Sequence, residues 1–101
     1  MRVRYTLEAL SHLASIARYI RGHNASAAVR VRAKLRSSAE RLGRFPNIGR
    51  HAPSGATREW KVPGLPYVVA YEIHPDADEV VILAIFHEAQ QRPGQSPARS
   101  D

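Results

Sequence analysis

The second half of the chain carries basic, phenolic and imidazole side chains that could act together on a phosphodiester. Cleavage of RNA at an internal 2′-hydroxyl needs a general base, a general acid and cations that stabilise the charge developing on phosphorus. The side chains able to supply these groups are Arg58, Lys61, Tyr67, Tyr71 and His87. The alternative for the two tyrosines is a place in the hydrophobic core, because they alternate with apolar residues along one predicted strand.

Other kinds of catalysis find little support in the sequence. Cysteine is absent, no serine lies in a G-x-S-x-G turn, and no phosphate-binding loop is present. The histidines, at positions 12, 23, 51, 74 and 87, form neither an H-E-x-x-H nor an H-x-H pattern. We therefore expect no nucleophilic triad, no metal site and no cofactor.

Positive charge is concentrated in one segment. The net charge is +6, and residues 24–50 hold seven basic residues against one acidic residue, whereas the rest of the chain is balanced with eight of each. A field localised in this way favours an acidic partner, either nucleic acid or an acidic protein segment. The plainer interpretation is a solvated helix face, which charge runs commonly form.

Periodicity predicts a short strand and two helices before the sheet. Residues 2–5 alternate like an edge strand, and Thr6 can cap a helix that ends near Gly22 in a left-handed C-cap. Asn24 or Ser26 can cap the second helix. The stripes predicted to face a core are Leu10, Leu13, Ala14, Ala17 and Ile20 in the first helix, and Ala28, Val31, Leu35, Ala39 and Leu42 in the second.

An irregular loop at 45–57, which we expect Phe45 and Ile48 to order, then leads into three strands. These strands are predicted at 58–62, 67–73 and 79–86. In strand register, Tyr67, Val69, Tyr71 and Ile73 share one face. The pattern predicts an α+β fold in which the N-terminal strand and a helical hairpin pack on an antiparallel sheet.

The last predicted strand is apolar on both faces from Val80 to Phe86. Burial on both sides of the sheet is therefore expected, but two helices can cover only one side. The other side must be covered by the loop at 45–57, by the C-terminal segment or by another chain. This shortage of cover is the first indication of a protein built around a partner.

Size and composition predict a single domain at residues 1–90. Residues 91–101 are expected to form a flexible tail, because their Gln, Arg, Pro, Gly and Ser cannot repay the entropy of ordering. No stretch has the length of a membrane span or the apolar core of a signal peptide. We expect a cytoplasmic protein without a membrane partner.

An ordered set of short motifs runs through nearly the whole chain. The set comprises Tyr5-Thr6 with Ile16, Tyr19 and Ile20; Asn24 with Ala27-Ala28; Leu42-x-x-x-Pro46-x-x-Gly49-Arg50; Arg58; Tyr67-Val68-Val69-Ala70-Tyr71; and Val81 to His87. In order and spacing it resembles the RelE/ParE superfamily of type II toxin–antitoxin toxins. The resemblance implies a toxin neutralised by direct binding of a cognate antitoxin, in a hetero-oligomer that reaches operator DNA only through the antitoxin.

The superfamily contains two activities, and the resemblance favours one of them. RelE-like members cleave mRNA on the ribosome, and they tend to carry an arginine just after the tyrosine that opens the third strand and a basic residue late in the last strand. Here those positions hold Val68 and the run 83–86, which is apolar. An aliphatic group cannot stabilise charge developing on phosphorus, so the chain is more similar to the ParE branch, whose studied members poison DNA gyrase as binding proteins.

The leading hypothesis is therefore a ParE-like toxin that inhibits DNA gyrase and replication without catalytic residues. Its expected target-binding residues are Arg30, Arg36, Arg41, Arg58, Lys61, His87 and Arg92, and its expected antitoxin-binding residues are Arg2, Arg4, Arg32 and Trp60. One alternative is a ribosome-dependent mRNA endoribonuclease that uses His87 with Arg58, Lys61 and Tyr71. The other is a non-toxic remnant that serves only as a co-repressor.

Overall fold

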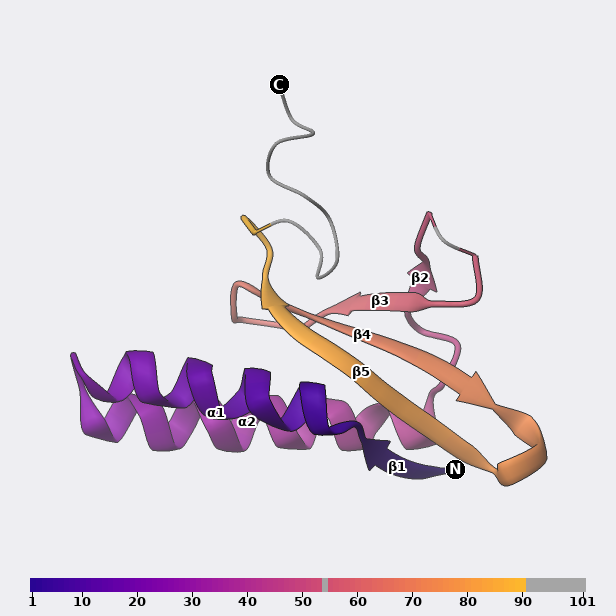
Figure 1. The fold of residues 1–101 in the computed structure, drawn as a ribbon, viewed down its shortest axis with the longest axis horizontal. Helices are drawn as coiled ribbons and strands as arrows, with labels where there is room; N and C mark the ends of the chain where they lie inside the picture. Colours follow the sequence, from indigo (N-terminus) through magenta and orange to yellow (C-terminus); the bar gives the residue numbers. More distant parts are fainter. Residues whose placement is uncertain (54, 91–101) are drawn as a thin grey trace.

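The computed structural model describes residues 1–53 and 55–90 (Figure 1). The chain begins with strand β1 (Arg2–Tyr5), which is followed by helices α1 (Leu7–Arg21) and α2 (Ala25–Arg44). The two helices run side by side as an antiparallel hairpin, and β1 lies at one end of it (Figure 1). None of the helices in these two ranges is long and apolar enough to cross a membrane.

Both helices begin at the caps that the sequence predicts. The N–H of Ala9 donates to Thr6 Oγ1 at 3.0 Å, and the N–H of Ala27 donates to Asn24 Oδ1 at 3.0 Å, so Asn24 is the cap of α2. Helix α1 ends at Arg21, as expected, but Gly22 is right-handed with φ −63°. The chain turns directly into α2 without a left-handed residue, and the backbone N–H groups of residues 22–24 donate to the Arg18 and Ile20 carbonyls.

The predicted core-facing stripe of α1 is confirmed in part, because Leu13 is buried and Ala17 and Ile20 are partly buried. Ala9 is also buried, whereas Leu10 and Ala14 are exposed. Helix α1 is apolar on two adjoining faces, and the sheet selects the face that continues through Ile16, which packs on the core. The predicted stripe of α2 is confirmed, because Ala28, Leu35, Ala39 and Leu42 are buried.

The sheet has five strands in the order β1-β5-β4-β3-β2. The bounds of the later strands are Arg50–His51 for β2, Arg58–Lys61 for β3, Tyr67–His74 for β4 and Glu79–His87 for β5. Strand β1 is an edge strand, as predicted, and it runs parallel to β5, whereas all other pairs are antiparallel. A 3₁₀ turn at Pro75–Ala77 and a left-handed Asp78, at φ 54°, connect β4 to β5.

The main core lies between the helices and one face of the sheet. Tyr67, Val69 and Tyr71 contribute to it from β4, which confirms the predicted face. Along β5 the alternation of side chains between the two faces shifts by one residue, because Ala70 pairs with Ala84 whereas Tyr71 pairs with Ile82. Leu83 is the extra residue of this β-bulge. The core residues contributed by β5 are therefore Val80, Ile82 and Ile85.

The apolar residues of β5 on the outer face of the sheet are buried within the chain itself, because Val81, Ala84 and Phe86 are 2%, 5% and 8% exposed, so the expected shortage of cover is not seen at these residues. Val68, Ala70, Ala84 and Phe86 form a second, small apolar cluster there. Ile48 from the loop and residues 88 and 90 after β5 stand at the rim of a cleft above this cluster. The loop thus supplies some of the predicted cover, and the expected tail at 91–101 lies outside the described residues.

The loop at 45–57 is not held in the way the sequence suggests. The side chains of Phe45 and Ile48 are 48% and 43% exposed. The Tyr71 hydroxyl anchors the loop instead, because it donates to the Pro46 carbonyl at 2.6 Å and accepts from the Gly49 N–H at 2.9 Å. A distant strand thereby replaces the local apolar contacts that we expected.

Candidate interaction surfaces

The five side chains considered for RNA cleavage do not gather at one site: Arg58 lies beside Tyr71, Tyr67 lies beside His87, and Lys61 points to the other face of the sheet. Arg58 and Tyr71 are cross-strand partners, and both hold the loop, since the Arg58 guanidinium donates to the Gly49 carbonyl at 2.7 Å. Lys61 points to the outer face, and its ammonium donates to the Leu65 carbonyl at 2.8 Å. Burial raises the pKa of Tyr71, and the Gly49 hydrogen bond and Arg58 oppose this shift only in part. Tyr71 is therefore a protonated, structural phenol at neutral pH.

His87 lies at the end of β5, on the opposite side of the sheet from Lys61. Its ring packs edge-on against Tyr67, with 5.6 Å between ring centroids. Its Nδ1 accepts from the Ala89 N–H at 3.0 Å, so the ring belongs to the turn that follows β5. Burial raises the pKa of Tyr67 beside it. The ring lines a small pocket toward α1, together with Ser15, Ile16 and Tyr19.

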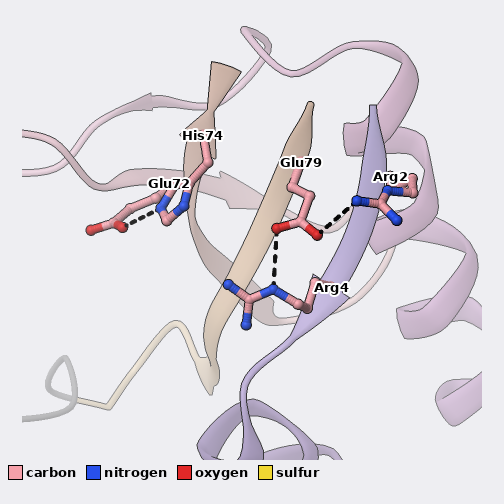
Figure 2. A network of polar contacts seen from close by, with 5 residues as sticks. All are labelled: Arg2, Arg4, Glu72, His74 and Glu79. Atoms are coloured by element: carbon pink, nitrogen blue, oxygen red, sulfur yellow. Dashed lines mark hydrogen bonds and ion pairs between the residues drawn. The ribbon is translucent and has the colours of Figure 1, made fainter. Parts of the chain in front are cut away.

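Two of the expected antitoxin contacts are engaged within the chain. On the outer face, the Glu79 carboxylate accepts from Arg2 at 3.3 Å and from Arg4 at 3.2 Å. His74 and Glu72 pair at 3.0 Å on the neighbouring strand (Figure 2). Val81 lies between Arg4 and Glu72 in the strand register, so this polar network flanks one of the apolar residues of β5. The acidic partner of Arg2 and Arg4 is thus already present in the fold.

The cations of α2 are divided between two sides of the helix. At 3.6 residues per turn, Arg30 and Arg41 are about three turns apart and lie on one side, whereas Arg36 lies on another. The contacts agree, because the Arg36 guanidinium lies 5.0 Å from the centroid of the Tyr5 ring and that of Arg41 lies 5.4 Å from the Phe45 ring. The three helix arginines expected to bind the target therefore do not form one surface.

One side of α2 forms a cationic groove with β3 and the turn after it. The groove has a volume of about 700 Å³, and its lining residues are Ala33, Lys34, Ser37, Ser38, Arg41, Arg44, Trp60 and Pro63. Among the residues that the structure describes, the lining contains three cations and no carboxylate. Trp60, expected to contact an antitoxin, lines this groove and is partly buried against the core.

The solvent side of the helical hairpin forms a second, mainly apolar groove. This hairpin groove has a volume of about 440 Å³ and is lined by Ala14, Ala17, Arg18, Arg21, Ala25, Ala28, Val29 and Arg32. Small side chains form its floor and arginines its rim. Val29 is 71% exposed, and Leu7, which is 85% exposed, lies on the same side of α1 as Ala14. Of the expected antitoxin contacts, only Arg32 lies here.

A third depression, the sheet cleft, opens on the outer face of the sheet. It has a volume of about 570 Å³ and is lined by Ile48, Arg50, Glu59, Trp60, Lys61, Val68, Phe86, Glu88 and Gln90. Val68 and Phe86 supply apolar groups and the charges are of both signs. Within residues 1–53 and 55–90, no three His, Cys, Asp or Glu side chains gather as metal ligands.

Several lining cations were missed by sequence reasoning. Lys34 and Arg44 of the cationic groove and Arg18 and Arg21 of the hairpin groove were not among the predicted site residues. The spacing of the cations along each helix could have identified them, because residues three, four, seven and eleven apart lie on the same side of a helix. Arg92, one of the predicted residues, lies outside the part of the chain that the structure describes.

A helical hairpin on a mainly antiparallel five-stranded sheet is also the fold of solved toxin–antitoxin proteins. A chain of the chromosomal ParDE system from P. aeruginosa superposes with a TM-score of 0.76 at 17% identity, over 86% of this chain and 95% of that chain. A chain of the RelBE2 toxin–antitoxin complex from Mycobacterium tuberculosis gives a TM-score of 0.65 at 24% identity, over 88% and 92%. The fold is therefore that of the RelE/ParE class.

Sequence comparison places the chain within this class. The family model described as "ParE toxin of type II toxin-antitoxin system, parDE" matches residues 3–92. The protein named "Putative toxin Y4kP" from Sinorhizobium fredii strain NGR234 is 36% identical over 92 residues, which span 91% of this chain and 93% of that protein. The chain belongs to the ParE toxin family of type II toxin–antitoxin systems.

Proposed function

We propose that this toxin acts in the cytoplasm by binding DNA gyrase and blocking supercoiling, and that a cognate antitoxin neutralises it. The observation that supports a binding role is that the side chains considered for acid–base catalysis lie at separate places in the fold. Arg58 and Tyr71 hold a loop, and Lys61 and His87 open to opposite sides of the sheet. General acid–base catalysis requires such groups within hydrogen-bond reach of one substrate.

The sheet cleft supports the same proposal. Its surface at Val68 and Phe86 is apolar, whereas a ribonuclease needs cationic donors where the phosphorane forms. The exposed Glu88 carboxylate in its lining would also repel an RNA backbone. A protein surface with apolar and mixed charged groups suits this cleft better than a polyanion does.

The hairpin groove is the surface we assign to the antitoxin. Small residues on its floor allow a helix to approach closely, and the rim arginines Arg18, Arg21 and Arg32 complement acidic side chains. A segment that is both amphipathic and acidic, and that folds as it binds, would bury the exposed Val29.

The test is a supercoiling assay with purified gyrase and relaxed plasmid, with the toxin added alone or with its antitoxin, scoring covalent cleavage complexes as well. We expect inhibition that the antitoxin relieves. Full gyrase activity with a protein that still arrests growth would refute the gyrase proposal. Cleavage of mRNA on translating ribosomes, lost in His87→Ala, would then establish the ribonuclease alternative. A folded protein that is harmless when overexpressed would instead favour the co-repressor remnant.

A further inference from the structure

Among the described residues, the cationic groove and the hairpin groove are each lined by three cations and no carboxylate, but the three cations of the cationic groove all come from α2, whereas those of the hairpin groove are divided between α1 and α2. The ion pairs within residues 1–53 and 55–90 involve Arg2, Arg4 and His74, and none involves a groove cation. The sheet cleft, by comparison, has two carboxylates in its lining. Lys34, Arg41 and Arg44 therefore present a positive potential that the described fold does not neutralise.

These cations form a row along a rigid element. Arg30, Lys34, Arg41 and Arg44 are spaced four, seven and three residues apart, which places them on one side of α2. From the first to the last, the row extends about 21 Å at 1.5 Å per residue. The Phe45 ring beneath Arg41 supports its guanidinium, and the Lys34 ammonium extends over the turn at Gly64.

We propose that the cationic groove, extended by Arg30, binds the phosphate backbone of duplex DNA directly. A linear row of cations matches a linear polyanion, and 21 Å corresponds to about six base pairs at 3.4 Å each. This contact goes beyond the proposed gyrase binding and revises the expectation that DNA is reached only through the antitoxin. The choice of DNA over RNA rests on the proposed function.

The composition of the groove disfavours other acidic partners. An acidic peptide segment needs apolar anchors to bind stably. The cationic groove offers Ala33 and Pro63 beside the core-packed Trp60, whereas the hairpin groove offers Val29 and four alanines. Single-stranded nucleic acid binds through bases stacked on aromatic rings. Trp60 is the one aromatic residue lining the groove among the described residues, and it packs against the core.

The test measures binding of the full chain to a fluorescent duplex by anisotropy across a range of salt concentrations, without gyrase. The duplex has about 20 base pairs, so that it exceeds the length of the cation row. The groove variant Arg41→Gln with Arg44→Gln is compared with Arg32→Gln with Arg36→Gln, which removes the same charge from the other side of α2. We expect the groove variant to lower the magnitude of the log–log salt slope by about 1.8, since each phosphate contact contributes about 0.9. The matched variant should keep the wild-type slope.

An equal decrease of the salt slope in the two variants would overturn the proposal, because net charge alone would then explain binding. Unchanged DNA binding in both variants would also overturn it. Poly-glutamate that competes as well as DNA would reassign the groove to an acidic protein. Tighter binding to single strands or to an RNA duplex would refute duplex DNA as the ligand. Thermal unfolding checks that each variant is folded. If the C-terminal end of α2 unfolds in the groove variant, the double variant Arg30→Gln with Lys34→Gln replaces it. Because gyrase is absent, failure here leaves the gyrase proposal untouched, and the reverse also holds.

Discussion

Tyr71 shows how one hydroxyl can determine the shape of a surface. Its ring is buried in the main core, and its hydroxyl bonds to both Pro46 and Gly49. Gly49 is required at this point, because a Cβ there would lie 2.5 Å from the Tyr71 oxygen. The motif Pro46-x-x-Gly49-Arg50 therefore positions Ile48 and Arg50 at the rim of the sheet cleft.

Tyr71→Phe should weaken the fold and loosen this loop. The substitution keeps the ring but leaves the Gly49 N–H and the Pro46 carbonyl without their partner. We expect a loss of about 1–3 kcal/mol in the free energy of unfolding, measured by urea denaturation. Tyr19→Phe, at a side chain that is 71% exposed, is the control and should be nearly neutral. Equal stability of the two variants would contradict the anchoring role.

At the scale of elements, the backbone groups on the β1 side of β5 are hydrogen-bonded in two different ways. Strand β1 pairs with it as far as Ile82. Beyond that point, Thr6 Oγ1 donates to the Leu83 carbonyl at 3.3 Å, and His12 Nδ1 accepts from the Ile85 N–H at 3.2 Å. Side chains of the cap and of α1 thus satisfy backbone groups beside the bulge, which would otherwise form an open edge.

The contact between α2 and β1 depends on a glycine. The Met1 amino group donates to the Gly43 carbonyl at 2.9 Å, and a Cβ on Gly43 would lie 2.5 Å from the Met1 carbonyl oxygen and 3.0 Å from Val3 Cγ2. The helix and the strand can therefore approach this closely only where a side chain is absent.

Gly43→Ala should displace β1 and lower the free energy of unfolding by about 1–3 kcal/mol, as is typical of overpacking. Urea denaturation measures the loss, and hydrogen exchange of the β1 amides reports the displacement. Gly22→Ala is the matched control, because Gly22 is right-handed and its Cβ would meet only ordinary contacts. We expect that control to be neutral or slightly stabilising. Protected β1 amides in Gly43→Ala would show that the strand tolerates the methyl group.

At the scale of the whole molecule, the surfaces differ in what they can bind. The hairpin groove combines small apolar residues with arginines from both helices, and the sheet cleft mixes charges of both signs over an apolar cluster. The cationic groove combines three cations of α2 with two serines and a few apolar residues. Because the grooves on α2 occupy different sides of one helix, a partner in one leaves the other accessible. Separate binding of antitoxin and DNA is therefore geometrically possible.

Val29→Glu should weaken antitoxin binding without unfolding the toxin. Val29 is exposed in the free chain, so stability should change by less than about 0.5 kcal/mol. The carboxylate removes the apolar contact of Val29 and competes with the acidic antitoxin for the groove arginines, so the affinity should weaken at least tenfold, measured by calorimetry with the purified antitoxin. Ser37→Glu, on the groove across α2, is the matched control and should bind antitoxin normally. Unchanged affinity in Val29→Glu would move the antitoxin to another surface.

Local sequence determined the elements of this protein, because caps and periodicity act over a few residues. Thr6 and Asn24 begin the helices, the apolar face of β4 follows from alternation, and the motif order carries the family. Only the tertiary structure decided the face of α1, the bulge at Leu83, the anchor at Tyr71 and the pairing of Arg2 and Arg4 with Glu79. The bulge and these contacts involve residues that are far apart in the sequence. Helix caps and hydrophobic periodicity, which act over a few residues, cannot predict such contacts. Tertiary packing also divided the cations of α2 between two surfaces, since a count of charges along the chain does not reveal which of them face the same neighbour.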